Sequence, residues 1–366
     1  MVHLAVALEG AGWHPAAWRE PGARPDELFR PRYWGDLVRE AERGLLDLVT
    51  IEDELGPGED RTDRVRGRLD AVLIASRVAP LTRHIGLVPT AIATHTEPFH
   101  LSKAIATLDY VSQGRAGVRV RIASKPEDAR HFGRREFPVP LPDLAAEAGD
   151  WIEVVRRLWD SWEDDAEIRD AATGRFIDRD KLHYIDFTGR FFSVKGPSIT
   201  PRPPQGQPLV AVLSHVEEIH RLATRSADLV FTTPHSAEQA GDLARELDGL
   251  LVFGDLVVFL DETERAARER KARLDDTDGA GYSSDAEIFT GTPAQLADQL
   301  LAWRDAGLTG FRLRPGAVPH DLTAITRGLV PELQQRGAFR REYEASTLRG
   351  LLGLDRPANR YAGATR

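Results

Sequence analysis

Strand-like and helical patterns alternate along almost the whole chain, and this alternation limits the possible folds more than any single motif. Eight short runs rich in aliphatic and β-branched residues are predicted as strands: residues 3–8, 48–51, 85–94, 117–123, 208–213, 229–232, 256–260 and 310–313. Repeated strand–helix units predict parallel strands joined by right-handed crossovers. Eight units in 366 residues predict closure into one α/β barrel of the (β/α)8, or TIM, type.

Residues 164–207 interrupt this rhythm between the fourth and fifth predicted strands. The segment is rich in glycine and proline and contains two strand-like pieces, residues 183–187 and 190–194. Because it is too long for a simple connector, we interpret it as an inserted hairpin and loop region lying over one end of the barrel. A single domain is therefore predicted for residues 1–366, with a C-terminal helix and tail over residues 330–366.

Composition excludes several classes of site and partner. Cysteine is absent, which excludes disulfide bonds, thiolate metal sites and cysteine nucleophiles. The net charge of −9 argues against a nucleic-acid partner. No apolar run approaches the ~20 residues that span a bilayer, and the start of the chain lacks a basic leader, so we expect a cytoplasmic protein without a membrane partner. Histidines and carboxylates show no metal-ligand spacing, so no metal site is predicted.

Seven segments, in order along the chain, resemble flavin-dependent monooxygenases of the bacterial luciferase-like superfamily. The resemblance is to the members that act on nitrilotriacetate or on dibenzothiophene sulfone and to those that form pristinamycin synthase. The segments are HPAAWR (14–19), AERGLLDLV (41–49), EPFHLSKAIATLDYVSQGRAG (97–117), WIEVVRRLWDSWEDDA (151–166), GRFFSVKGPSITPRPPQGQPLV (189–210), GTPAQLADQL (291–300) and VPELQQRGAFRREYEASTLRGLLGL (330–354). The resemblance implies a barrel that binds reduced FMN at its C-terminal mouth, an NAD(P)H:flavin reductase as partner, and a homodimer. It also implies that the cofactor carries the oxygenation of a small organic substrate. The substrate itself is not implied.

The same resemblance implies five cofactor-binding positions. Thr90 and Ala91 lie on the third strand, in a stretch that relatives place behind the flavin ring. Arg119 stands on the fourth strand, where relatives have an asparagine near the ring. Ser214 and His215 follow the fifth strand, where relatives bind the FMN phosphate at a helix N-terminus.

The alternation within the fourth strand has a further consequence. Arg119 and Arg121 share one face of the strand, and the valines between them occupy the other. In a barrel the apolar face packs under the helices, so both arginines are expected in the interior. Unpaired buried charges are costly, and Glu9, Glu52 and Asp53, near the ends of the first two strands, are the candidate partners. The arginines either form an ion-pair network or bind flavin or an anionic substrate, and the sequence leaves both possibilities open.

Other residues are expected near the mouth because active sites of such barrels lie at the C-terminal ends of the strands. Trp13 and His14 follow the first strand, and His95 follows the third, at a position where relatives usually have tyrosine. The predicted substrate pocket consists of Trp13, His14, Glu52, Asp53, His95 and Arg121. No catalytic side chain is predicted.

Departures from the family pattern keep two alternatives open. The usual glycine of the phosphate-binding turn is missing, Val212 and Val216 stand at other positions of that turn, and residues 275–288 replace a much longer insertion after the seventh strand. One alternative is a non-catalytic or flavin-poor homologue that acts as a subunit or binding protein. The other is an oxidoreductase that uses a deazaflavin. Reconstitution with FMN separates the first alternative from the monooxygenase and from the deazaflavin-dependent oxidoreductase.

Overall fold

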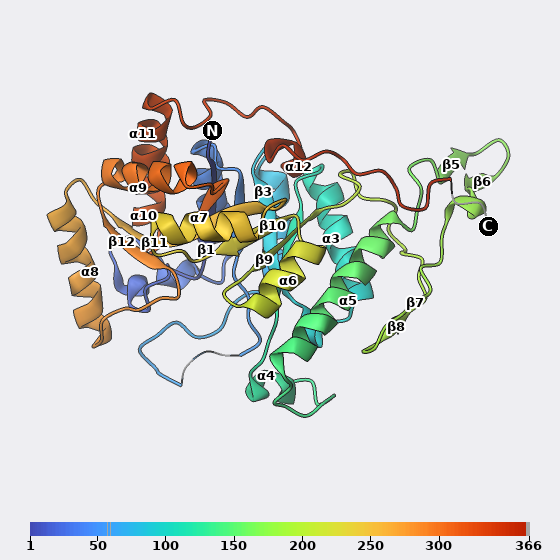
Figure 1. Cartoon of the computed structure of the whole chain (residues 1–366), viewed down its shortest axis with the longest axis horizontal. Coiled ribbons are helices and arrows are strands. Elements are labelled where there is room, and N and C mark those ends of the chain that lie inside the picture. The colour runs from blue at the N-terminus through green and yellow to red at the C-terminus, as the bar shows by residue number, and fades with distance from the viewer. Residues whose placement is uncertain (57, 59, 364–366) are drawn as a thin grey trace.

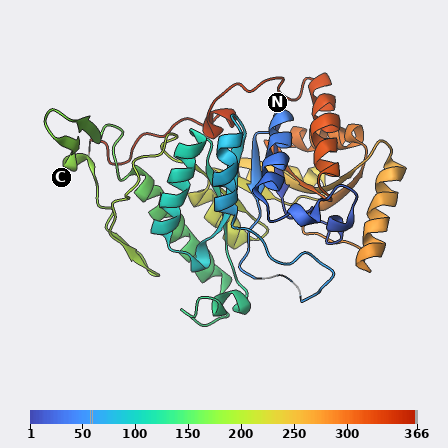
Figure 2. The same cartoon turned by 180° about the vertical axis from the view of Figure 1, so that it is seen from behind.

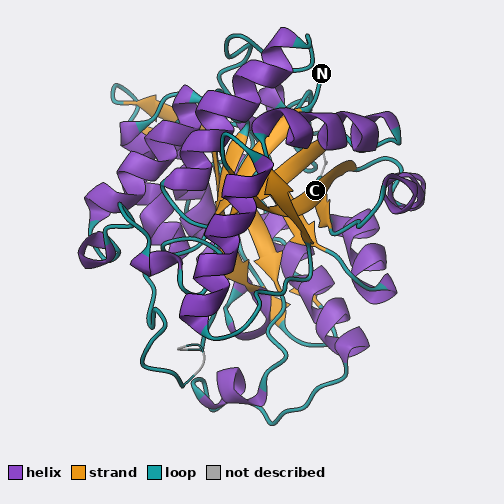
Figure 3. Cartoon of the chain, turned by 90° about the vertical axis from the view of Figure 1, so that its left-hand side faces the viewer, coloured by secondary structure: helices purple, strands orange, loops and turns teal. Residues whose placement is uncertain are grey.

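Eight parallel strands form a closed barrel in the computed structural model, which describes residues 1–56, 58 and 60–363. The barrel strands are β1 (His3–Leu8), β2 (Leu48–Ile51), β3 (Gly86–Ile92), β4 (Gly117–Arg121), β9 (Leu209–Leu213), β10 (Leu229–Thr232), β11 (Leu251–Leu260) and β13 (Gly310–Pro315). They pair in this order, and the pairing of β13 with β1 closes the ring. Figure 3 shows the strands surrounded by helices. The predicted (β/α)8 barrel is confirmed.

Helices follow the barrel strands, and most of them cover the outside of the barrel (Figures 1 and 2). They are α1 (Pro31–Arg43), α2 (Ala71–Val78), α3 (Pro98–Ser112), α4 (Pro126–Arg130), α5 (Leu141–Asp160), α6 (Glu217–Ser226), α7 (Ala237–Glu246), α8 (Glu264–Asp278), α9 (Pro293–Asp305), α10 (His320–Ala324), α11 (Val330–Gln335) and α12 (Leu348–Leu351). The first helix starts at Pro31, where proline is well tolerated. Within the described residues, no helix has the length and apolar character needed to cross a membrane.

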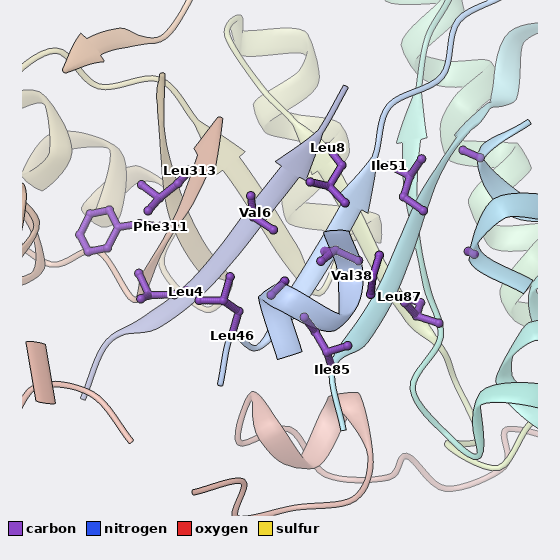
Figure 4. Close-up of a cluster of buried hydrophobic side chains, with 14 of the residues drawn as sticks. Leu4, Val6, Leu8, Val38, Leu46, Ile51, Ile85, Leu87, Phe311 and Leu313 are labelled. Carbon is purple, nitrogen blue, oxygen red and sulfur yellow. The ribbon is translucent and has the colours of Figure 1, made fainter. Parts of the chain in front are cut away.

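The main core lies between the barrel and the helices. Alternate strand residues point outward, so that Leu4, Val6 and Leu8 of β1 pack beside Phe311 and Leu313 of β13 (Figure 4). Val118 and Val120 of β4 belong to the same buried cluster. The outward position of these valines confirms the expectation that the other face of β4, with its arginines, points into the barrel.

The two ends of the barrel interior differ in polarity. At the amino ends of the strands, Ala5, Leu48 and Val88 pack against Leu348 of α12, which closes that end. The loops after β2 and β4 lie at the opposite end, at the lower edge of Figure 1. Charged side chains occupy the interior toward this second end, and the candidate site lies there.

The insertion between β4 and β9 contains two antiparallel hairpins. The first pairs β5 (Glu167–Asp170) with β6 (Arg175–Ile177), and the second pairs β7 (Phe187–Thr188) with β8 (Ser193–Val194). The insertion was expected to lie over one end of the barrel, but neither hairpin does so. Both lie outside α3 and α5 (Figures 1 and 2). The second hairpin is held there because Ile185, Phe187 and Val194 pack with Val154 and Leu158 of α5.

The seventh barrel strand is longer than predicted. β11 begins at Leu251, and its first half pairs with β10 while its second half pairs with an additional strand, β12 (Glu287–Gly291). Gly254 and Asp255 interrupt the apolar run, so the sequence pattern indicated only the second half. β12 was not predicted. Its pairing brings the short segment between α8 and β12 beside the mouth of the barrel.

Candidate active site

Three neighbouring cavities open among the loops at the carboxyl ends of the strands. The β1 cavity, of about 330 Å³, is lined by Glu9, Trp13, Trp18, Trp34 and Arg68, among others. The β4–β9 cavity, of about 430 Å³, is lined by residues that include Arg119, Arg121, Val212, His215, Asp285 and Arg314. Both volumes lie in the range of small-molecule sites. Trp13 and Glu52 line both cavities and form part of the wall between them.

A network of buried ion pairs crosses the barrel beneath these cavities. Arg119 Nη1 lies 2.7 Å from each carboxylate oxygen of Glu52, and Arg312 Nη1 lies 3.4 Å from Glu52 Oε1. Asp255 accepts hydrogen bonds from both Arg312 and Arg314, each with an Nε–oxygen distance of 2.9 Å. All five side chains are at most 5% exposed. The interior therefore holds three arginines and two carboxylates, each with an oppositely charged neighbour.

The electrostatics of this network keep its members charged. Burial alone would raise the pKa of Glu52 and of Asp255, but the nearby arginines outweigh burial and hold both pKa values below their usual range. Burial lowers the pKa of Arg119 to about 10, despite the opposing effect of Glu52. Arg119 is therefore still protonated at neutral pH.

Of the three expected partners for the strand-four arginines, only Glu52 forms a buried ion pair with Arg119. Arg121 lies nearer the mouth and donates to the backbone oxygen of Asp53 at 2.7 Å. The Asp53 carboxylate instead accepts hydrogen bonds from the backbone N–H groups of Glu54 and Ala71. Asp53 therefore fixes the loop before α2, and the interior pairing expected for its carboxylate is wrong.

The predicted phosphate-binding turn is arranged unlike an anion cradle. The Ser214 hydroxyl is buried and lies 3.4 Å from the backbone oxygen of Val216. The first turn of α6 carries Glu217 and Glu218, and negative side chains there compete with an anion for the positive end of the helix. Within this turn, His215 contributes a basic side chain to the lining of the β4–β9 cavity. A phosphate near this turn would depend on side-chain cations more than on backbone N–H groups.

The two histidines of the predicted pocket pack within the protein: His14 through hydrogen bonds and His95 through ring stacking. His14 is buried, with Nε2 at 3.0 Å from Asp275 and Nδ1 accepting from the backbone N–H of Ala16. These bonds hold the loop after β1 against α8. His95 stacks on Phe132 with a centroid separation of 4.9 Å. It lines neither of these two cavities nor the third one, which is described below.

The remaining predicted flavin contacts lie apart from the β4–β9 cavity. Thr90 and Ala91 line a third cavity, of about 570 Å³, beside Asp53. Thr90 is the register partner of Arg119 across β3 and β4. Thr90 Oγ1 and Arg119 Nε are both buried without a hydrogen-bond partner among the described residues. A buried polar atom left unpaired costs about 1–3 kcal/mol, so the Arg119 guanidinium retains an unsatisfied donor next to the cavity.

Sequence reasoning missed three members of the network, Asp255, Arg312 and Arg314. The signal was present, because Arg312 and Arg314 alternate with apolar residues on the eighth strand in the same way as Arg119 and Arg121 on the fourth. Arg314 also lies over the ring of Trp13, with its guanidinium carbon 4.6 Å from the ring centroid. Among the described residues, no cluster of three or more histidines and carboxylates could hold a metal ion.

Raising the pH from about 4.5 to 7 is expected to destabilise the folded protein through Glu9. Burial raises the pKa of Glu9 from 4.5 to about 7, so over this interval the folded state retains a proton that the unfolded state has released, and stability falls. Because 30% of the Glu9 side chain is exposed, we expect an effect of about 1 kcal/mol, less than the shift alone would give.

Glu9→Gln tests this expectation in urea unfolding at pH 5 and pH 8. The free energy of unfolding of Glu9→Gln, relative to that of the wild type, should be higher at pH 8 than at pH 5. The control Glu97→Gln, at a side chain that is 63% exposed, should show no such difference. An equal effect of Glu9→Gln at both pH values would contradict the raised pKa.

Comparisons with known proteins place these features in context. A family model described as luciferase-like monooxygenase matches residues 11–274. The chain is 32% identical to N-acetyl-S-(2-succino)cysteine monooxygenase of Bacillus subtilis, over 99% of this chain and 98% of the relative. It is 31% identical to nitrilotriacetate monooxygenase component A of Aminobacter aminovorans, with the same coverage of both chains. The solved structure of EDTA monooxygenase from Chelativorans sp. BNC1 superposes with a TM-score of 0.87 at 24% identity, over 97% of this chain and 98% of that chain.

The alignment with the Bacillus subtilis relative extends over 435 positions, although this chain has 366 residues. The relative therefore has residues at dozens of positions where this chain has none. The barrel is retained in full, so the missing residues belong to loops and insertions around it.

Proposed function

The chain belongs to the luciferase-like monooxygenase family, in agreement with the resemblance found in its sequence, and we propose that it oxygenates a small organic substrate with reduced FMN. The FMN would be supplied by a separate NAD(P)H-dependent flavin reductase, as in a two-component system. The homodimer expected from the resemblance stays a prediction.

One observation carries this proposal beyond family membership. The β4–β9 cavity has the volume of a small-molecule site and is lined by three arginines and a histidine: Arg119, Arg121, Arg314 and His215. Cationic side chains around a concave site favour an anionic ligand such as a flavin mononucleotide. The position agrees with the active-site end of (β/α)8 barrels.

The residues of this cavity fit a flavin through their arginines, not through a helix N-terminus. Arg119 would donate its unsatisfied Nε–H to a polar edge of the ring once the guanidinium shifts from Glu52 toward the cavity. Arg121, which is 35% exposed, and His215 would face an anionic group near the opening. When bound, a reduced flavin supplies the electrons that activate dioxygen.

The other lining residues exclude water and position the ligands. Trp13 packs against Arg314, and Ile122, Val212 and Leu222 supply an apolar wall on the β4–β9 side. A dry wall strengthens the interactions of the arginines with an anion. No acid–base side chain is required for this role, because the cofactor carries the chemistry.

Titration of the purified protein with FMN tests the proposal, with flavin fluorescence and calorimetry as readouts. We expect binding at micromolar concentration or tighter, which corresponds to about −8 kcal/mol. Arg119→Asn should weaken binding at least tenfold, since it removes a charged donor from the cavity. Arg130→Asn, at a 73% exposed arginine of α4, is the matched control and should leave the affinity unchanged.

A second candidate function is a non-catalytic subunit or binding protein, favoured by the acidic first turn of α6 and by the pairing of Arg119 with Glu52. The same titration separates the two candidates. Absence of FMN binding by the wild type, together with binding by Arg119→Asn, would mean that the ion pairs have replaced the cofactor site. The monooxygenase proposal would then be wrong.

A further inference from the structure

Among the described residues, the charges buried beneath the cavities balance once a carboxylate from outside the barrel is included. Arg119, Arg312 and Arg314 contribute three positive charges, whereas the barrel strands and their ends contribute two carboxylates, Glu52 and Asp255. The third carboxylate that contacts these arginines is Asp285. It comes from the short segment between α8 and β12 and is 44% exposed.

Asp285 is held between the side chains of Arg314 and His215. Arg314 donates to it through Nη1 at 2.6 Å and Nη2 at 3.1 Å, and His215 Nε2 lies 3.2 Å away. Burial would raise the pKa of Asp285, but the bonds from His215 and Arg314 outweigh it and hold the pKa well below its usual range. All three residues line the β4–β9 cavity. The carboxylate of Asp285 is therefore held tightly by Arg314 and His215 at this point of the cavity wall.

The segment that carries Asp285 lies outside the barrel, whereas the other two carboxylates lie on a barrel strand or directly after one. Residues 279–286 contain no helix or strand. Gly279 adopts a positive φ of 80°, and neither it nor Gly281 has another atom within 4 Å of the position of a Cβ. Asp255, by contrast, lies within β11 and is fully buried. Of the carboxylates that pair with the interior arginines, Asp285 is the one that can be exchanged without disrupting the barrel.

We propose that Arg314 and His215 form an anion-binding site that Asp285 fills from within the chain, and that the acidic group of a ligand entering the β4–β9 cavity displaces Asp285. The ligand group is a carboxylate or a phosphate monoester. Its arrival keeps the buried charges balanced, while the released Asp285 turns to water. The identity of the ligand rests on the proposed function, because the group belongs either to the phosphate of FMN or to an acidic substrate.

Asp285→Asn tests the displacement with inorganic phosphate and succinate as probes in calorimetric titrations. Because the amide competes poorly for Arg314, the variant should bind one or both anions at least tenfold more tightly than the wild type. Glu287→Gln is the matched control, since it removes the same charge two residues away, where Glu287 contacts His235 instead of the cavity. It should bind both anions with wild-type affinity.

A second measurement uses the wild type alone, so the test survives if Asp285→Asn does not fold. Hydrogen–deuterium exchange of residues 279–286 should accelerate when a saturating anion displaces Asp285. Equal anion affinities of wild type and Asp285→Asn, or unchanged exchange of this segment in the wild type at a saturating anion concentration, would overturn the proposal.

Flavin titrations of the same variant identify the source of the anion. A larger gain in affinity for FMN than for riboflavin assigns the site to the flavin phosphate. Equal changes for the two flavins, with a gain for succinate, assign it to an acidic substrate. If neither flavin binds but Asp285→Asn still gains affinity for phosphate, the monooxygenase function fails while the anion site stands.

Discussion

Asp255→Asn is expected to destabilise the protein by about 3–5 kcal/mol, the cost of breaking a buried ion pair by removing one partner. Asp255 is fully buried and is the shared acceptor of Arg312 and Arg314. An asparagine of nearly the same shape keeps one acceptor oxygen but turns an NH2 donor toward guanidinium donors. Arg314 retains Asp285, and Arg312 retains its longer contacts with Glu52 and with the Thr50 hydroxyl.

Thermal unfolding followed by circular dichroism measures the effect. For a protein of this size, a loss of this magnitude lowers the melting temperature by about 4–7 °C. Asp298→Asn on α9 is the matched control, because Asp298 is 71% exposed and pairs with Arg336 at the surface. The control should cost less than about 1 kcal/mol. If Asp255→Asn cost no more than the control, the two arginines would have to be solvated or otherwise neutralised, contrary to their complete burial.

The barrel was predictable because its signals are local. Each strand is a short apolar run, and each helix has its own periodicity, so the order of elements follows without knowledge of distant contacts. The same local signal failed at β11, where Gly254 and Asp255 break the apolar run. The broken pattern has a physical cause, since Asp255 points into the barrel to meet two arginines from β13.

The site was predictable only where one strand determines the direction of a side chain. Alternation placed Arg119 of β4 in the interior, and the position of Glu52 at the carboxyl end of β2, two strands away in the barrel, made it a candidate partner. The contacts of Asp285 with Arg314 and His215 depend on the path of the loop between α8 and β12, which periodicity does not determine. His14 shows the same limit, because its burial against α8 depends on how the loop after β1 folds.

A double-mutant cycle on Arg119 and Glu52 is expected to separate the stability of the network from its ability to bind a ligand. Arg119→Met and Glu52→Gln should each destabilise the fold by about 3–5 kcal/mol, because each leaves the opposite charge buried with fewer partners. In the double variant neither charge remains, so the loss should be at least 2 kcal/mol smaller than the sum of the single losses. Urea unfolding of the four proteins measures this coupling.

Flavin titration of the same four proteins shows whether Arg119 contacts the ligand. If Arg119 contacts the ligand, Arg119→Met should lose FMN binding, and the double variant should remain unable to bind although much of its stability has returned. A folding defect alone predicts the opposite, with binding recovering in parallel with stability. Recovery of FMN binding in the double variant would therefore assign Arg119 to the scaffold of the barrel, and continued loss would assign it to the ligand site.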